Sequence, residues 1–491
     1  MNVSPPDVLP MSASCAASMP FVVDLDGTLV KSDLLFECVM SFVRSKPLHC
    51  LKLFPWLWHG KAYLKDRLAM TSDVDLATLP YDPDVLRMIE EQRNAGRKIV
   101  LATASHYTLA VRIAEHLQVF DDVLGSTLEQ NLSGTNKRDA LVALYGEKSF
   151  DYIGNSLDDL PIWRSARQAY IVNPLAGVQR AARHLDNVAQ VVHSRVTYFR
   201  SLYKALRIHQ WMKNVLIFVP LLAAHQVANP LLLGRGLLAF MLFGLCASSV
   251  YLLNDLLDLN DDRRHPSKRN RPFANGSLSI QSGLLIFPLL LSVSFIGAWL
   301  WLPHPFIAVL ACYYGLTLVY SLVLKRLMAL DVIALALLYT LRIIAGGAAF
   351  GLDLTGWMLA FSMFMFMFLS LALVKRYAEL LLALHGGITG KTGGRDYFPA
   401  DLAMLSSLGA ASGYLAVLVL ALYIHDSATT ELYAYPRWLW FACPLMLFWI
   451  TRIWLLTHRG RMNEDPVVFA LRDRLSLVMG TVFCLIFWVA A

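Results

Sequence analysis

The sequence is poor in cysteine and lacks the spacings at which cysteines usually bind metals or form cross-links. Its seven cysteines include no Cys-x-x-Cys pair, so neither a disulfide framework nor a zinc site is indicated, and a reduced, cytoplasmic setting is favoured for the N-terminal part. The first twenty residues contain no basic stretch followed by an apolar core, so we expect no signal peptide and interpret residues 1–19 as a loose tail. No basic surface interleaved with aromatic residues is evident, which argues against nucleic acid as a partner.

Apolar residues are concentrated in the C-terminal part of the chain. Hydrophobic residues make up 56% of the 491 positions, but long apolar stretches begin only near residue 212. Stretches of about 20 apolar residues are typical of membrane-spanning helices. We therefore expect a globular domain over residues 20–200 and an all-α, polytopic membrane bundle of about nine transmembrane helices over residues 205–491. The expected spans cover residues 214–228, 233–255, 281–302, 305–324, 329–350, 356–375, 402–424, 436–456 and 473–491.

Lysine and arginine are distributed very unevenly among the loops between these spans. One set of alternate loops carries Arg263, Arg264, Lys268, Arg269, Arg271, Lys325, Arg326, Lys375, Arg376, Lys391, Arg395, Arg452, Arg459, Arg461, Arg472 and Arg474. The opposite set carries essentially Arg235 and Arg437. By the positive-inside rule, this bias predicts a multi-pass protein of the bacterial inner membrane whose N-terminal domain and large polar loops are cytoplasmic. The C-terminus is then expected on the other side.

The globular part has the pattern of a doubly wound, Rossmann-like α/β domain. Four apolar segments, at residues 21–23, 98–102, 151–153 and 169–172, are interpreted as buried parallel strands separated by helices. In such sheets the site lies at the carboxyl ends of the strands. Polar residues follow three of these strands: Asp24 and Asp26, then Thr103 and Ser105, then the run 154–159.

The segment Asp24-Leu25-Asp26-Gly27-Thr28-Leu29 resembles the signature of the haloacid dehalogenase superfamily. The resemblance implies that Asp24 attacks phosphorus to form an aspartyl-phosphate and that Asp26 acts as the general acid and base. It further implies the following roles: Thr103 and Ser105 bind phosphate, Lys137 neutralises charge, and Asp24, Asp26, Asn155 and Asp159 surround Mg²⁺.

Two features of this segment of the chain leave alternatives open. Many superfamily members have aspartate at the position of Asn155, and a neutral ligand weakens Mg²⁺ binding, which puts turnover in doubt. Residues 33–80 are interpreted as an inserted helical cap, and its aromatic stretch 53–58 is either well-packed core or a surface that meets lipid or the membrane part.

A cluster of acids follows the second expected span. Asp255, Asp258 and Asp262 are spaced i, i+3, i+7 and so share one face of a helix. Such carboxylates repel one another at a membrane helix end, and a divalent cation resolves the conflict. Mg²⁺ held in this way typically bridges to substrate phosphates, and Lys268 and Arg271 are positioned to meet anionic oxygens. The alternatives are a solvated helix end for the acids and ordinary positive-inside charge for Arg263, Arg264 and Arg269.

This region resembles the first aspartate-rich motif of the UbiA superfamily of intramembrane prenyltransferases. The resemblance extends over residues 205–491, including Lys213 in the segment 210–214 and the stretch from Tyr320 to Arg342. It implies an Mg²⁺–diphosphate site in a cavity at the cytoplasmic side of the bundle. Asp331 and Arg342, eleven residues apart, face the same way but are too distant to pair. The further substrate-binding candidates from this resemblance are Lys213, Asn254, Lys325, Asp331 and Arg342.

The second aspartate-rich motif of the aromatic prenyltransferases is missing. In its place stands a cationic cluster with one acid, made of Lys375, Arg376, Tyr377, Glu379 and Arg395. Lys375 and Glu379 are alternatively a plain i,i+4 helix pair. Extra cations suit a donor that carries another phosphate besides its diphosphate. The family branch that makes decaprenylphosphoryl-5-phosphoribose resembles this chain in the Lys-Arg-Tyr-x-Glu segment and in residues 465–474. That branch implies phosphoribosyl pyrophosphate as the electrophile and a polyprenyl phosphate as the nucleophile.

The two resemblances together imply a bifunctional, Mg²⁺-dependent membrane enzyme. The transferase would make a polyprenylphosphoryl-5-phosphoribose, and the N-terminal domain would remove the 5-phosphate on a route to arabinose donors for the cell envelope. A homo-oligomer is compatible with the sequence. Two alternatives remain: an aromatic, quinone-type prenyltransferase, and a transporter or membrane scaffold with a degenerate phosphatase domain. Acids clustered at one membrane face, rather than at mid-membrane, argue against a transporter.

Overall fold

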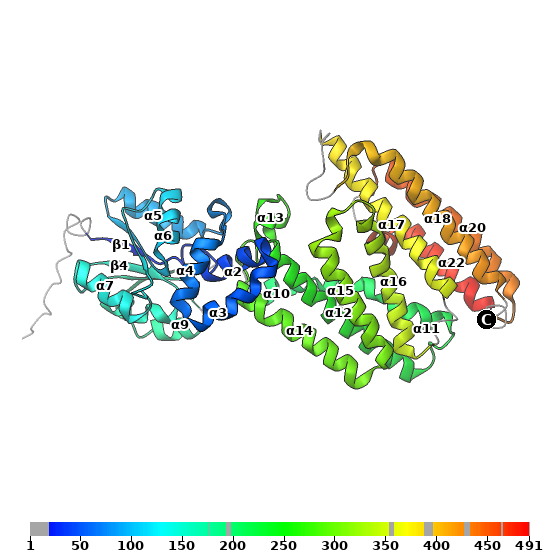
Figure 1. Cartoon of the computed structure of the whole chain (residues 1–491), viewed down its shortest axis with the longest axis horizontal. Helices are drawn as coiled ribbons and strands as arrows, with labels where there is room; N and C mark the ends of the chain where they lie inside the picture. Colours follow the sequence, from blue (N-terminus) through cyan, green and yellow to red (C-terminus); the bar gives the residue numbers. More distant parts are fainter. Residues whose placement is uncertain are drawn as a thin grey trace, which may run out of the picture. The chain divides into compact units, whose positions relative to one another are not determined.

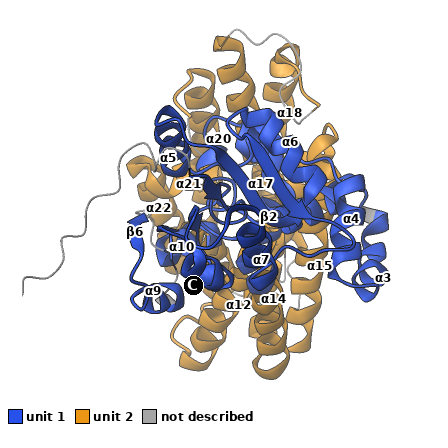
Figure 2. Ribbon diagram, turned by 90° about the vertical axis from the view of Figure 1, so that its left-hand side faces the viewer, with its two compact units in different colours: residues 1–206, 252–286 blue, residues 207–251, 287–491 orange. Residues whose placement is uncertain are grey.

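The computed structural model describes residues 19–174, 176–192, 198–352, 358–386, 396–426, 433–462 and 465–490. The chain divides into two compact units, which are coloured separately in Figure 2. Unit 1 comprises residues 1–206 and 252–286, and unit 2 comprises residues 207–251 and 287–491. The aspartate-rich segment around residues 255–262 therefore belongs to the same compact unit as the N-terminal α/β domain.

A parallel sheet forms the centre of unit 1, and Figure 1 labels two of its strands, β1 and β4. The sheet has six strands in the order β3-β2-β1-β4-β5-β6. Four strands match the segments expected from the sequence, whereas β3 and β6 were not expected. These two lie at the edges of the sheet and leave side chains partly exposed, so they lack the continuous apolar run of a buried strand. The strands are β1 (Phe21–Val23), β2 (Ile99–His106), β3 (Asp122–Ser126), β4 (Asp151–Gly154), β5 (Ala169–Val172) and β6 (Val188–Val192).

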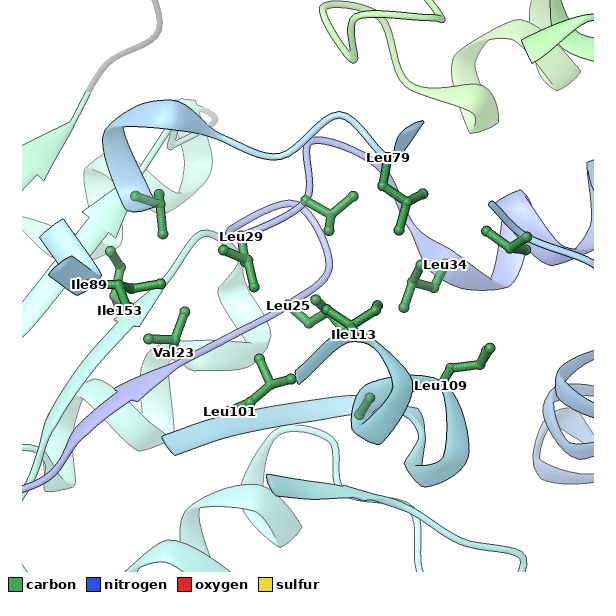
Figure 3. Packing of buried hydrophobic residues seen from close by; sticks show 14 of the residues in the cluster. Val23, Leu25, Leu29, Leu34, Leu79, Ile89, Leu101, Leu109, Ile113 and Ile153 are labelled. Carbon is green, nitrogen blue, oxygen red and sulfur yellow. The ribbon is translucent and has the colours of Figure 1, made fainter. Parts of the chain in front are cut away.

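Both faces of β1 are buried, which fixes the position of the carboxylates that follow it. Val23 pairs with Leu101 of β2 and with Ile153 of β4. It packs in one apolar cluster with Leu25 and Leu29 of the following loop (Figure 3). Burying side chains of this size stabilises a fold by about 1.5–3 kcal/mol each. The strand and the loop that carries both aspartates are thus held by the same core.

Helices cover both faces of this sheet. On one face α5 (Pro83–Asn94) and α6 (Tyr107–Leu117) contribute to the same cluster as Val23. On the other face a second cluster joins the sheet to α7 (Thr135–Tyr145), α8 (Leu160–Ser165) and α9 (Ala176–Ala182). The short 3-10 helix η3 (Leu157–Asp159) precedes α8. This is the doubly wound arrangement expected from the sequence.

The residues between β1 and β2 form the helices of the expected cap. Asp33 begins the first of them by accepting a hydrogen bond from the Leu35 amide at 2.9 Å. The aromatic stretch 53–58 is partly core and partly surface. Leu53 and Trp56 pack on the core, whereas Phe54 and Trp58 are exposed. The cap elements are α2 (Leu34–Ser45), η1 (Pro47–Lys52), α3 (Leu53–Trp58), α4 (Lys61–Thr71) and η2 (Leu76–Thr78).

Unit 1 also contains the polar segment that lies between two long apolar helices. These helices, α12 (Pro230–Leu257) and α14 (Ile280–Trp301), each contribute residues to both units. Between them lie α13 (Leu259–Arg264) and η5 (Lys268–Asn270). The helix α10 (Tyr198–Leu206) contacts this segment, since Lys204 Nζ donates to the Asn270 carbonyl at 2.7 Å.

Unit 2 is a bundle of apolar helices. Helices α17, α18, α20 and α22 lie side by side in it (Figure 1). Its elements, besides parts of α12 and α14, are η4 (Ile208–Phe218), α11 (Val219–Ala223), α15 (His304–Leu322), η6 (Leu324–Arg326), α16 (Leu330–Phe350), α17 (Met358–His385), η8 (Pro399–Asp401), α18 (Leu402–His425), η9 (Pro436–Phe441), α20 (Ala442–His458), α21 (Pro466–Arg472) and α22 (Arg474–Ala490).

The expected count of nine membrane spans was wrong. Among the described residues, seven helices are long and apolar enough to cross a membrane, or up to eight if α21 and α22 together form one span bent by 83°. The expected first span, 214–228, is divided between the 3-10 helix η4 and the five-residue helix α11. Pro220 at the start of α11 has no amide hydrogen and cannot donate a helical hydrogen bond. The buried side chain of Asn214 in η4 accepts a hydrogen bond from Arg342. Neither residue favours one continuous apolar helix.

Glycine in α16 lets η4 approach closely. A Cβ on Gly346 would lie 1.9 Å from the Ile217 carbonyl oxygen, so only glycine fits at this contact. Small residues commonly allow such close backbone contacts in membrane helix bundles. The contact places η4, which carries Lys213 and Asn214, against the helix that carries Arg342.

Candidate active sites

Asp24 lies at the carboxyl end of β1, where its side chain is buried and paired with a cation. Its Oδ1 accepts a hydrogen bond from Lys137 Nζ at 2.7 Å, and its Oδ2 accepts one from Thr28 Oγ1 at 3.1 Å. Gly27 has φ +77°, and a Cβ there would lie 2.1 Å from Asn155 Nδ2. The loop after β1 therefore needs glycine to make its turn and to admit the Asn155 side chain.

Asp26 is held by three donors at the start of the cap. Its Oδ1 accepts from the Leu34 amide at 2.8 Å, at the first residue of α2. Its Oδ2 accepts from Ser105 Oγ at 2.7 Å and from Thr103 Oγ1 at 3.2 Å. The structure thus brings Thr103 and Ser105 to the first motif, as the sequence predicted, and their hydroxyls here contact Asp26.

Asp159 organises the turn after β4. Its Oδ2 accepts from the amides of Asn155 and Ser156 at 3.0 and 2.9 Å, and its Oδ1 accepts from Tyr152 OH at 2.8 Å. Tyr152 also accepts a hydrogen bond from Lys137 Nζ at 3.0 Å. Tyr152 was missed from the sequence, where its only signal is a hydroxyl inside an apolar strand.

Burial dominates the electrostatics of this site. It raises the pKa of the Asp24 carboxyl to about 7, while the Lys137 ammonium opposes the shift. Burial also lowers the pKa of Lys137, but the charges of Asp24 and Asp159 outweigh it, so the net pKa of this ammonium is raised. Lys137 therefore stays charged next to Asp24, where it can stabilise a carboxylate or a phosphoryl oxygen.

The oxygen atoms around Asp24 are of the kind that Mg²⁺ prefers. Among the described residues no three His, Cys, Asp or Glu side chains converge to hold a metal, but Mg²⁺ usually needs only one or two carboxylates besides substrate phosphates. Asp24 supplies such a carboxylate, and the Asn155 side chain lies against Gly27 of the same loop. Both oxygens of Asp159 accept hydrogen bonds, as do both oxygens of Asp24, so either carboxylate would exchange some of these donors for the metal.

The aspartate-rich segment of unit 1 contains a break between two helices. Helix α12 ends at Leu257, and Asp258 has φ −98° and ψ 16° before α13 begins. Arg271 Nη1 bridges Asp255 Oδ1 at 3.1 Å and Asp262 Oδ2 at 2.6 Å. Asp258 instead pairs with Arg44 of the cap at 2.8 Å. The amides of Asp258 and Asp262 still bond the carbonyls four residues earlier, at 2.9 and 2.8 Å, so the acids differ in their side-chain partners more than in their helical placement.

Asp255 and Asp262 are both buried, at 2% exposed. Burial raises the pKa of Asp262, and Arg271 opposes the shift. One guanidinium balances only one of the two carboxylate charges, so this pair of acids favours a further cation. This donor set fits Mg²⁺ bound by two carboxylates and substrate phosphates.

The other candidates in this segment differ in their surroundings. Asn254 is partly buried, and its carbonyl accepts the Asp258 amide at 2.9 Å. Lys268 is exposed in η5. Arg263, interpreted from the sequence as ordinary positive-inside charge, is buried and donates to both Glu37 oxygens at 3.1 and 2.6 Å, so that interpretation was wrong for this residue.

In unit 2, Asp465 joins two lysines from distant parts of the chain. Its Oδ2 lies 3.1 Å from Lys213 Nζ and 3.1 Å from Lys375 Nζ. Tyr339 OH donates to its Oδ1 at 3.3 Å, and the same oxygen accepts the Val467 amide at the start of α21. Burial raises the pKa of Asp465, but the two lysines outweigh it, and the net pKa lies below its usual range.

Arg342 lies in an aromatic environment next to this group. Its Nε donates to Asn214 Oδ1 at 3.1 Å and its Nη2 donates to Tyr313 OH at 3.2 Å. Its guanidinium lies 5.1 Å from the Tyr313 ring centre and 5.4 Å from that of Tyr339. Among the described residues the buried Asn214 Nδ2 has no hydrogen-bond partner.

Arg376 forms a buried ion pair with Asp331 and also contacts Glu379. Its Nε donates to Asp331 Oδ2 at 2.5 Å, and its Nη1 donates to Glu379 at 2.5 Å. Glu379 thus forms an i,i+3 pair with Arg376, and Lys375 pairs with Asp465. Arg376 is 1% exposed, and within the described part of the chain its Nη2 atom has no hydrogen-bond partner.

The remaining candidates are Tyr377, Lys325 and Arg395. The Tyr377 hydroxyl contacts His458 Nδ1 at 2.8 Å, and its ring packs on Trp454. Lys325 lies in η6 and is partly exposed. Arg395 lies outside the described residues.

Comparisons with known proteins match two successive parts of the sequence. Residues 215–478, more than half of the chain, match the UbiA prenyltransferase family. The chain belongs to this family. Residues 21–164 match haloacid dehalogenase-like hydrolases, so this UbiA-family chain carries a hydrolase-like domain at its N-terminus.

Relatives of this UbiA-family chain include one that matches nearly its whole length. The uncharacterized protein y4nM of Sinorhizobium fredii is 36% identical over 474 residues, which cover 96% of this chain and 91% of that relative. The decaprenyl-phosphate phosphoribosyltransferase of Mycobacterium tuberculosis is 32% identical over 276 residues, 55% of this chain and 87% of that enzyme. A solved structure, a UbiA homolog from Archaeoglobus fulgidus bound to GPP and Mg²⁺, has 15% identity and a TM-score of 0.45, covering 59% of this chain and 99% of that one.

Proposed function

We propose that this protein transfers 5-phosphoribose from phosphoribosyl pyrophosphate to a polyprenyl phosphate and then removes the 5-phosphate. The observation that carries the first half is the group of cations around Asp465 in unit 2. The Asp465 carboxylate pairs with Lys213 and Lys375. Arg342 lies next to this group, against Tyr339. Aromatic prenyltransferases are expected to carry a second set of acids in this region. Such a group of cations instead favours an additional phosphate over an additional metal.

The leaving diphosphate requires neutralisation. Asp255, Asp258 and Asp262 would hold Mg²⁺, which would supply positive charge to the diphosphate as it departs. Arg271, which pairs with Asp255 and Asp262, would also donate to oxygens of the diphosphate.

The cations of unit 2 would bind the remaining phosphates. Lys213 and Lys375, which pair with Asp465, would contact the 5-phosphate or the lipid phosphate. Arg376 would donate to the same phosphates through its Nη2 atom, which has no hydrogen-bond partner among the described residues. In the reaction, an oxygen of the lipid phosphate forms a bond to ribose C1 while the C1–O bond to diphosphate breaks. Binding the lipid phosphate and the 5-phosphate of the donor would hold the attacking oxygen close to ribose C1.

The N-terminal domain would then hydrolyse the 5-phosphate ester. Asp24 would attack phosphorus, with Lys137 stabilising the charge on the phosphoryl oxygens. Asp26 would protonate the leaving hydroxyl and later activate water. Thr103 and Ser105, whose hydroxyls donate to Asp26 in this structure, would donate to the phosphate instead when it is bound.

We infer the membrane orientation from the lysine and arginine distribution. Unit 1 contains both the α/β domain and the loop between α12 and α14, so both lie on the same side of the membrane. That loop is rich in cations, which by the positive-inside rule makes this side cytoplasmic, in a bacterial inner membrane.

A single reconstitution experiment tests the proposal. Purified protein is incubated with Mg²⁺, phosphoribosyl pyrophosphate and a polyprenyl phosphate, and the lipids are weighed by mass spectrometry. The expected product is a lipid-linked ribose without its 5-phosphate. A product formed only from a polyprenyl diphosphate and an aromatic acceptor would contradict the proposal and favour a quinone-type prenyltransferase. No transfer with any pair of substrates would favour a scaffold.

A further inference from the structure

The cap exposes large apolar side chains along η1 and α3. Leu48 and Trp58, near the two ends of this segment, are 90% and 91% exposed. The exposed side chains follow one another mostly at intervals of three residues, so they share one side of the segment. Exposed apolar patches of this kind mark interaction sites on proteins. The η1–α3 surface consists of Leu48, Leu51, Phe54, Leu57 and Trp58.

Helix α3 is apolar on its inner side as well. Residues 53–58 contain only leucine, phenylalanine, proline and tryptophan, and Leu53 and Trp56 pack on the core of unit 1. A helix that is apolar all round is normally covered on every side. The core covers one side of α3, and this composition indicates an apolar partner for the other.

The charge around the η1–α3 surface indicates what that partner is. Residues 44–65 contain no aspartate or glutamate, and Lys46, Lys52 and Lys61 are exposed within or beside the surface. Basic residues that flank exposed Trp, Phe and Leu are typical of segments that lie in the interface of an anionic bilayer. The lysines are therefore complementary to acidic lipid headgroups.

The cap is attached to the ends of two helices that are long and apolar enough to cross a membrane. Arg44, in the last turn of α2, donates from Nη1 to the carbonyl of Leu257, the last residue of α12, at 2.6 Å. Gln281, at the start of α14, donates from Nε2 to Asp33 at 3.0 Å. All four residues lie in unit 1. One cap helix and its N-cap residue thus contact the ends of two candidate spans.

These contacts bring η1 close to the lipid surface. Helix α12 has 28 residues and a length of about 42 Å at about 1.5 Å per residue. That length is enough to cross the hydrocarbon core of about 30 Å and to reach the headgroups with its end at Leu257. η1 begins at Pro47, three residues after Arg44, and three residues span at most about 11 Å. The η1–α3 surface therefore starts within reach of the headgroups.

We infer that the η1–α3 surface lies in the interface of an anionic phospholipid bilayer. Its apolar side chains would enter between the headgroups, while the lysines would keep their ammonium groups at the level of the lipid phosphates. Since the Leu34 amide of the same cap donates to Asp26, the contact would also keep the hydrolase-like site near the lipid surface. The inference requires neither of the two reactions proposed above.

The test measures whether one position of the surface enters the bilayer. The full-length protein carries a fluorescent dye at Trp58→Cys, and every cysteine except the buried Cys38 and Cys246 is replaced by serine. It is reconstituted in phosphatidylcholine vesicles, with or without phosphatidylglycerol, that contain a lipid bearing a quencher near its headgroup. Phosphatidylglycerol should increase the quenching, because it attracts the lysines. High salt should reduce the quenching, because it screens that attraction.

Matched variants assign the effect to the surface. A dye at Leu144→Cys occupies another exposed apolar position, in α7 on the other face of the sheet, and should not be quenched. Lys46→Glu with Lys52→Glu should lower the quenching at position 58, through a change of about fivefold in the ratio of bound to free cap for each lysine. Arg180→Glu with Arg183→Glu changes the net charge equally at two other exposed positions and should leave the quenching unchanged.

A second readout needs no substitution. Hydrogen exchange of the backbone amides in residues 48–58 of the wild-type protein should be slower in vesicles with phosphatidylglycerol than in vesicles without it, whereas exchange in α7 should not change. Absence of quenching at Trp58→Cys, or equal quenching at Leu144→Cys, would overturn the inference. A response that follows protein concentration in place of lipid composition would overturn it too, since a second copy of the chain would then cover the surface.

Discussion

The buried pair of Glu37 and Arg263 should be essential to the stability of unit 1. Both side chains are 3% exposed, and Arg263 Nε also donates to the Ala274 carbonyl at 3.0 Å. Glu37→Ala leaves the guanidinium buried without its counter-ion. Removing one partner of a buried pair costs about 3–5 kcal/mol, because the remaining charge is not compensated. We expect the free energy of unfolding of unit 1 to fall by that amount.

Pulse proteolysis of the purified protein in increasing urea measures this loss, with fragments of residues 20–200 followed by mass spectrometry. Asp75→Asn is the matched control, because it breaks the exposed pair with Arg264 and should cost less than about 1 kcal/mol. The double variant Glu37→Leu with Arg263→Met should recover most of the loss, since it removes both charges together. A loss below about 1 kcal/mol for Glu37→Ala would refute the reasoning that burial makes this pair costly to break.

Further predictions concern the two chemistries and the topology. Asp262→Asn should lower the transfer rate about a hundredfold or more at fixed Mg²⁺, as expected when a metal ligand is lost, and excess Mg²⁺ should restore part of it in the lipid assay. Asp24→Asn should leave transfer intact but yield a lipid heavier by one phosphate group, and a product identical to that of wild type would remove the hydrolase claim. Lys375→Met should raise the KM for phosphoribosyl pyrophosphate or for the lipid phosphate by about tenfold, through loss of a charged contact, whereas an unchanged KM for both would limit Lys375 to its pair with Asp465. A cysteine introduced as Ser267→Cys should resist a membrane-impermeant thiol reagent in intact cells, and labelling from outside would reverse the proposed orientation.

Local sequence patterns predicted the α/β domain well because its signals are contiguous. The apolar triplet of β1 is followed at once by Asp24 and Asp26, and the parallel sheet then brings the ends of β2 and β4 to the same edge. Thr103 and Ser105 were placed near the first motif in this way, whereas Lys137, in α7, was suggested only by the family resemblance. The edge strands β3 and β6 were not predicted from the sequence, because edge strands do not need the fully apolar composition of a buried strand.

Long-range pairing explains most of what was missed in unit 2. Lys213, Lys375 and Asp465 come from three distant segments, and nothing in the local pattern of any one of them indicates the other two. In the sequence, Asp465 belongs to the segment 465–474 that resembles the phosphoribosyltransferase branch, and the structure shows that it also caps α21 through the Val467 amide. The same limit applies to spans, since hydropathy alone did not reveal that residues 208–223 divide into two short helices.

The spacing of the aspartate-rich segment shows what a local rule can and cannot predict. A spacing of i, i+3, i+7 places three side chains on one face of a helix, and the amides of Asp258 and Asp262 still bond the carbonyls four residues earlier, although α12 and α13 are separated at Asp258. The spacing does not reveal the partners of the acids: Arg271 pairs with Asp255 and Asp262, whereas Arg44 of the cap pairs with Asp258. Arg44 precedes Asp258 by 214 residues, so no local pattern could indicate this pair. The pair joins the cap of the N-terminal domain to the aspartate-rich segment within one compact unit.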